Sequence, residues 1–130
     1  MTKLLGIDYG QKKIGLAIGD DQSRLAEPLL VVRVGSLEEA LEKVAKVVEI
    51  EKVEKMVIGV SEGVTAEKTR IFGEQLLEKA GCEVVYQDET LTTYHAQTLS
   101  LQANLKQKKR KDREDAYAAA LIVQAYLDEL

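Results

Sequence analysis

Acidic residues stand at four points of the chain where an α/β protein can build a metal site. The first, Asp8, ends the apolar run from Leu4 to Ile7 and precedes a turn that contains Gly10. An unpaired carboxylate at the end of a buried strand is costly to desolvate. We therefore expect Asp8 to face solvent or to hold a positive partner, with a divalent cation as the leading candidate. The alternative is a turn aspartate that caps local backbone N–H groups.

The other acids follow later segments of the chain. Glu62 comes just after the apolar run 55–60, and Asp88 and Glu89 end the run that begins at Glu83. Asp115 opens the last predicted helix. The carboxyl ends of parallel strands share one edge of a sheet, so these acids can converge there. Such an all-oxygen cluster suits Mg²⁺ or Mn²⁺ and is poorly matched to zinc or copper.

Three of these acids also have a simpler interpretation. Glu89 can be a charge that stabilises the start of the helix after the fifth strand. Glu62 can be a solvated loop carboxylate. Asp115 lies three residues after Asp112, so it can be the partner in a helix cap and a favourable charge at the helix start.

A basic segment precedes Asp115. Residues 106–113 carry +5, whereas the whole chain of 130 residues carries −4. A local basic arm on an acidic body is typical of phosphate binding, and a solvated linker is the alternative. The residues that we assign to phosphate binding are Lys108, Lys109, Arg110 and Lys111.

Composition predicts one domain over residues 1–130, with a core of ordinary size. The single cysteine, Cys82, excludes an internal disulfide framework and a Cys-rich zinc site. No run approaches the ~20 apolar residues of a membrane span. The chain enters a strand at once and leaves no room for a signal peptide, which predicts a cytoplasmic protein with no membrane partner.

Apolar periodicity predicts a mixed five-stranded sheet flanked by helices, an α/β arrangement of three antiparallel and then parallel strands. The strands are expected at residues 3–8, 13–19, 27–34, 55–60 and 83–87. A capping box at Ser36 opens the first helix, and Thr65 is expected to cap the second, which stops at Gly81. Further helices are expected over residues 93–104 and 116–127.

Three spaced motifs resemble the YqgF family, also called RuvX or Holliday-junction-resolvase-like proteins. They are Gly6-Ile7-Asp8-Tyr9-Gly10 with Lys12-Lys13-Ile14-Gly15, then Asp88-Glu89-Thr90-Leu91-Thr92-Thr93, then Lys108-Lys109-Arg110-Lys111 before Asp115-Ala116-Tyr117. The resemblance covers essentially the whole chain. It implies an RNase H-like fold, with Asp8, Glu89 and Asp115 as catalytic acids that bind Mg²⁺ or Mn²⁺. It also implies nucleic-acid hydrolysis in 5′-end processing of pre-16S rRNA.

The chain departs from that family at two places. Thr90 stands where the family usually has arginine, and the loop from Val60 to Gly63 is shorter and lacks a proline. These differences affect the expected rate and substrate preference more than the fold. Glu62 can substitute for Glu89 or supplement it, because other RNase H-like nucleases place an acid after their fourth strand.

Other functions stay open. The substrate can be structured RNA, as in precursor rRNA, or branched DNA, as for a Holliday junction resolvase, and we expect a monomer or weak homodimer. A non-catalytic RNA-binding module for ribosome assembly is the alternative of another class. The Asp8-to-Gly10 turn also resembles the first phosphate loop of sugar kinases, but those proteins need a second domain and a further Gly-rich loop that 130 residues do not hold.

Overall fold

The computed structural model describes residues 1–61, 63–88 and 107–130, and for residues 64 and 107–113 it describes the backbone alone. The elements are β1 (Lys3–Asp8), β2 (Lys13–Asp20), β3 (Ala26–Arg33), α1 (Leu37–Glu51), β4 (Lys55–Val60), α2 (Val64–Ala80), β5 (Glu83–Asp88) and α4 (Gln107–Asp128). Every predicted strand is present within one residue of its expected bounds. The helix predicted over residues 93–104 lies outside the described residues. No helix in the described part of the chain is long and apolar enough to span a membrane.

The five strands form one mixed sheet in the order β3-β2-β1-β4-β5. β2 pairs with β1 and β3 in antiparallel fashion, whereas β4 pairs with β1 and β5 in parallel fashion. The predicted topology is confirmed. Because β1 is the central strand, its last residue, Asp8, lies between two neighbouring strands.

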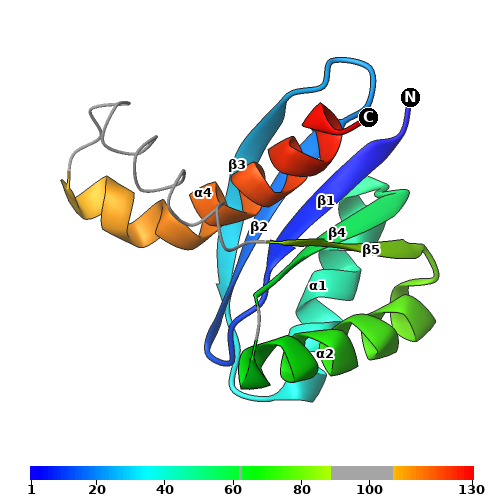
Figure 1. The fold of residues 1–130 in the computed structure, drawn as a ribbon. Coiled ribbons are helices and arrows are strands. Elements are labelled where there is room, and N and C mark those ends of the chain that lie inside the picture. The colour runs from blue at the N-terminus through cyan, green and yellow to red at the C-terminus, as the bar shows by residue number, and fades with distance from the viewer. Residues whose placement is uncertain (62, 89–106) are drawn as a thin grey trace.

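The two faces of the sheet carry different helices (Figure 1): α1 and α2 cover one face, and α4 crosses the other. Alternation along the strands divides the core accordingly. Leu5 and Ile7 of β1 pack with Phe72 and Leu76 of α2. Leu4 faces the opposite way and packs with the α4 side chains Ile122, Val123 and Leu127.

Glycines allow α4 to approach β1 and β2 closely. A Cβ atom on Gly6 would lie 2.5 Å from the carbonyl oxygen of Ala119, and one on Gly19 would lie 2.7 Å from a methyl of Val123. Side chains at these positions would therefore push the helix off the sheet. The closest approach is at Gly15, where an added Cβ would collide with the backbone of Asp115.

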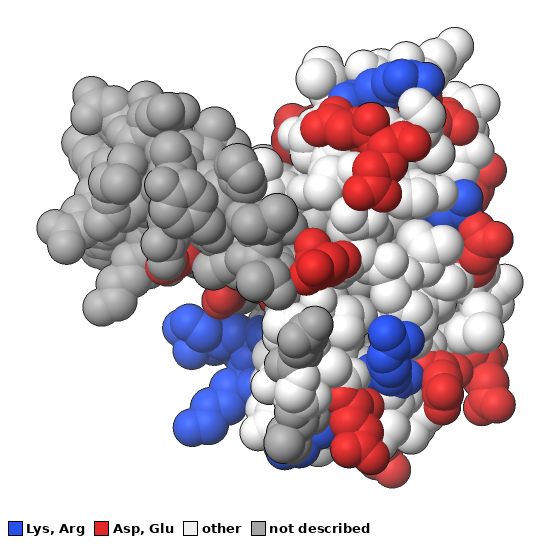
Figure 2. All heavy atoms as spheres, in the orientation of Figure 1, with Lys and Arg blue, Asp and Glu red and all other residues white. Residues whose placement is uncertain are grey.

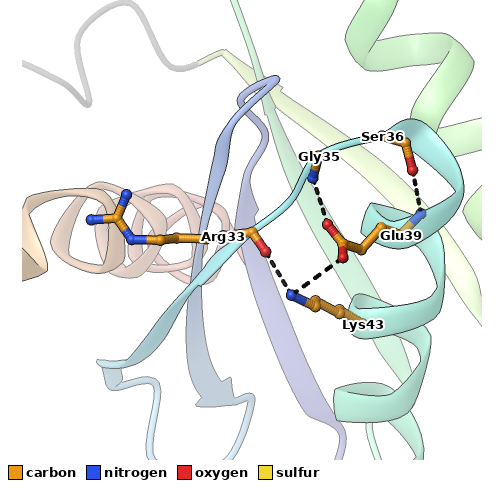
Figure 3. Close-up of polar contacts among 5 residues, drawn as sticks. All are labelled: Arg33, Gly35, Ser36, Glu39 and Lys43. Atoms are coloured by element: carbon orange, nitrogen blue, oxygen red, sulfur yellow. Dashed lines mark hydrogen bonds and ion pairs between the residues drawn. The ribbon is translucent and has the colours of Figure 1, made fainter.

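The start of α1 matches its prediction in outline (Figure 3). The Ser36 hydroxyl accepts a hydrogen bond of 3.1 Å from the Glu39 backbone N–H. The Glu39 carboxylate accepts from the N–H of Gly35, one residue before the position that a standard capping box uses. Lys43 then donates to the carbonyl of Arg33 at 2.7 Å, so the end of β3 is tied to α1.

Two helix starts were predicted wrongly. Helix α2 begins at Val64 after Gly63, not after a Thr65 cap, and no side chain caps it. Gly63 has φ +105°, a conformation open to glycine that lets the chain turn directly into the helix. Helix α4 begins at Gln107 rather than at 116, so the basic segment is the start of this helix and not an arm before it.

Candidate active site

Asp8 lies on the α4 side of the sheet. Leu4 packs against α4 and Gly6 approaches its backbone, and residue 8 follows in the same alternation. Asp8 is half-buried and is the register partner of Gly15 on β2. Gly10 keeps the connection between these strands tight, because a Cβ there would lie 2.5 Å from the Lys13 carbonyl oxygen. The central strand therefore presents its terminal carboxylate toward α4.

Asp115 meets Asp8 at Gly15. The backbone of Asp115 packs directly on Gly15, and Gly15 stands opposite Asp8 in the β1–β2 pair. Residues 8 and 115, which are far apart in the sequence, thus come together around a position that has no side chain. Asp115 lies eight residues after the start of α4, which excludes the alternative of a helix-cap partner.

Lys13 is a further residue of this site, which the sequence did not single out. Its Nζ lies 3.6 Å from Oδ2 of Asp115, and both side chains are partly exposed to solvent. Its register partner on β3 is Arg33. Figure 3 shows the Arg33 side chain pointing away from α1, while its carbonyl oxygen faces Lys43. Lys13 belongs to the first motif, in Lys12-Lys13-Ile14-Gly15, but the sequence alone gave it no role of its own.

Basic side chains gather at the same end of the molecule. Figure 2 shows Lys and Arg side chains at the lower left, near the β1–β2 connection of Figure 1, with Asp or Glu side chains directly above them. Residues 108–111 form the first turns of α4. Acidic and basic groups thus adjoin at one edge, an arrangement that can bind a metal ion and an anion side by side.

The third acid comes from a part of the sheet that is only partly described. Asp88 is the exposed last residue of β5 and pairs in register with Val60. Glu89 and Glu62 lie outside the described residues. No group of three or more potential ligands is found among residues 1–61, 63–88 and 107–130. The donors brought together there, Asp8 and Asp115, are both carboxylates, which fits a hard divalent cation.

Comparison with known proteins gives a consistent result over the full length. Residues 2–129 match the family model described as "RuvX: Holliday junction resolvase". A protein of Lactococcus lactis subsp. cremoris named "Putative pre-16S rRNA nuclease" is 36% identical over 98% of this chain and 94% of its own length. A protein of the same name from Carboxydothermus hydrogenoformans is 35% identical over 97% of this chain and 96% of its own length.

Solved structures share the fold at low sequence identity. RuvC of T. thermophilus in complex with a Holliday junction substrate has a TM-score of 0.67 and 17% identity, covering 98% of this chain and 97% of that one. The fowlpox virus Holliday junction resolvase has a TM-score of 0.68 and 13% identity, covering 99% and 100%. These likenesses establish the RNase H-like resolvase fold. Together with the full-length family match, they show that this chain belongs to the RuvX family.

Proposed function

We propose that this chain is a metal-dependent nuclease that hydrolyses phosphodiester bonds in the 5′-end processing of pre-16S rRNA. The observation that carries the chemistry is the meeting of Asp8 and Asp115 at Gly15. The choice of substrate rests on the relatives, which bear the name of pre-16S rRNA nucleases. Such an enzyme would act in the cytoplasm, where ribosomal precursors are made.

Asp8, Asp115 and Glu89 are the proposed ligands for Mg²⁺ or Mn²⁺. Alternation along β5 favours Glu89 over Asp88. Val85 packs on the α4 side and Gln87 donates to Glu129 after α4, so the odd-numbered positions of β5 share the side of Asp8. Asp88 belongs to the opposite series, with Val84 and Tyr86. Glu62 would substitute for Glu89 or supplement it.

The protein groups would divide the work of phosphodiester hydrolysis. A bound divalent cation supplies activation of water and neutralisation of phosphate charge. Asp8, at the end of the central strand, provides the most rigid carboxylate of the site. Asp115 holds the other side and is oriented by Lys13. Lys13 can also turn to a phosphate oxygen, because its side chain is 48% exposed.

The basic turns of α4 are the proposed binding surface for the substrate backbone. Lys111 and Lys108 precede Asp115 by four and seven residues, the spacing of one helix face. Together with Lys109 and Arg110 they would bind phosphates, which gives affinity without reading the sequence. Nucleic acid held along this part of α4 would lead toward Asp115.

Substitution of Asp8 and Asp115 tests the proposal. Asp8→Asn and Asp115→Asn should abolish Mn²⁺-dependent cleavage of an RNA that spans the 5′ end of 16S rRNA. Both variants should keep their thermal stability, because removing one of two neighbouring carboxylates relieves repulsion. Asp128→Asn, on the same helix at its far end, is the matched control and should cleave normally. Cleavage that survives both active-site substitutions would refute the assignment.

A Holliday junction resolvase is the second candidate, favoured by the family model and by the shared fold. Resolving a junction needs two active sites related by a dimer axis. Cleavage of four-way DNA junctions by a stable dimer, with RNA left intact, would favour this candidate. Tight RNA binding that needs no carboxylate, with no cleavage of either substrate, would indicate a non-catalytic ribosome-assembly module instead.

A further inference from the structure

A small hollow lies beside the proposed active site, on the other side of β1. It has a volume of about 220 Å³ and is lined by Tyr9, Gly10, Gln11, Thr65 and Lys68. Tyr9 directly follows Asp8, but its ring packs on Phe72 of α2, whereas Asp8 faces α4. The acidic site and this hollow therefore lie on opposite sides of β1, and consecutive residues, Asp8 and Tyr9, belong to them.

The lining of the hollow suits an anion. Lys68 supplies a positive charge, and Tyr9, Gln11 and Thr65 each carry a side-chain hydrogen-bond donor. These four side chains make no hydrogen bond or ion pair with one another or with other described residues. None of the five described lining residues is acidic. Their donors are thus available to a ligand that offers several acceptor oxygens.

Tyr9 is held in place for this role. Its ring stacks on Phe72 with centroids 4.3 Å apart and planes inclined by 21°. The Tyr9 hydroxyl is a hydrogen-bond donor in the lining of the hollow. Phe72 already occupies one face of the ring, which favours a polar contact through the hydroxyl over stacking of a nucleobase between the two aromatic rings.

We propose that this hollow binds a non-scissile phosphate of the same nucleic-acid strand that is cut at Asp8 and Asp115. The inference rests on the proposed function for the identity of the ligand. It adds a contact on the α2 side of β1, opposite the basic turns of α4. A strand held at both places would cross the end of β1, with the cut bond between two bound phosphates, and the contact in the hollow would add binding energy.

Binding measurements test the hollow without requiring cleavage. Lys68→Gln should weaken binding of a structured RNA, measured without divalent cations, by roughly two- to fivefold, as for an exposed ion pair. The slope of log affinity against log salt should also fall by about 0.7 to 0.9, the share of one bound phosphate. Tyr9→Phe should weaken binding less and leave the salt slope unchanged, because the donor that it removes is neutral.

Lys79→Gln is the matched control, since it removes the same charge from an exposed position about 16 Å further along α2. It should leave both affinity and slope unchanged. Equal losses for Lys68→Gln and Lys79→Gln would mean general electrostatics and would overturn the proposal, as would no loss for Lys68→Gln. Inorganic phosphate is then added to the wild-type chain until the hollow at Lys68 is saturated. If the affinity for RNA stays the same, the hollow is a separate phosphate site, and this result also overturns the proposal.

Steady-state kinetics separate this inference from the proposed function. If both hold, Lys68→Gln raises KM and leaves kcat unchanged, because the contact is made equally in the ground and transition states. A fall in kcat with no change in KM would contradict a binding role. If Asp8→Asn still cleaves but Lys68→Gln loses RNA affinity as stated, the nuclease assignment fails and the hollow stands.

Discussion

Gly15 is the position where one methyl group should damage the active site most. In Gly15→Ala, the new Cβ would lie 2.9 Å from the backbone nitrogen of Ala116 and closer still to the Asp115 carbonyl. Ordinary contact begins at 3.4 Å, and the Asp115 carbonyl is the nearest atom, so α4 would have to retreat by more than about an ångström. The obstacle is backbone on both sides, which no change of rotamer can relieve. Asp115 would therefore move away from Asp8.

Two effects of different size follow from this displacement. Overpacking costs about 1–3 kcal/mol of stability, which exceeds the gain of about 0.4–1 kcal/mol expected from replacing a flexible glycine. Misplacement of a reacting group on the ångström scale can cost on the order of a hundredfold in rate. We expect Gly15→Ala to fold with a lowered melting temperature and to lose between about ten- and a hundredfold in kcat.

Two glycines serve as controls in the same assays of thermal unfolding and RNA cleavage. Gly35→Ala should change neither property, because its Cβ would meet only the Glu39 carboxylate at 3.6 Å. Gly6→Ala should destabilise the fold through its contact with Ala119, one turn beyond Asp115, and should reduce cleavage less than Gly15→Ala. A Gly15→Ala variant with wild-type stability and cleavage would show that α4 does not hold Asp115 in its active position.

Other substitutions address the remaining parts of the site. Lys13→Gln should change the free energy of unfolding by less than about 1 kcal/mol, because its ion pair is exposed, yet lower the cleavage rate roughly tenfold or more; an unchanged rate would remove Lys13 from the site. Alanine at residues 108–111 should weaken binding of all RNA sequences alike and reduce the salt slope by up to about 0.9 for each duplex phosphate that the variant no longer neutralises; an unchanged slope would contradict phosphate binding. Glu89→Gln should abolish cleavage and Asp88→Asn should spare it, and the reverse result would refute the alternation argument for β5.

The strand order could be predicted because the relevant signals are local. Each strand is an apolar run with a clear end, and helical segments between parallel strands fix their direction. These rules are sufficient to put β1 at the centre and Asp8 at its end. The same rules cannot say which side of the sheet an acid faces relative to a distant helix. That information came from the pairing of Asp8 with Gly15.

The start of α4 was missed because the pattern used was hydrophobic. Residues 107–113 contain no apolar side chain, so periodicity was silent there. Lysine, arginine and glutamine are nevertheless good helix formers, and their propensity was the signal available. Lys13 was missed for another reason: its ion pair joins residues 102 positions apart, and only the packing of α4 on β2 brings them together.

This chain has Thr90 where the family usually has arginine. The site nevertheless keeps a positive charge near Asp115. Lys13 approaches Asp115 from β2, and Arg33 is its register partner on β3. The carbonyl of Arg33 accepts a hydrogen bond from Lys43 of α1, which ties the end of β3 beside Lys13 to that helix. Lys13 of β2 can offset the negative charge of a bound phosphate, because opposite charges attract at close range. Among the described residues, the cation beside Asp115 thus comes from β2, the antiparallel neighbour of β1.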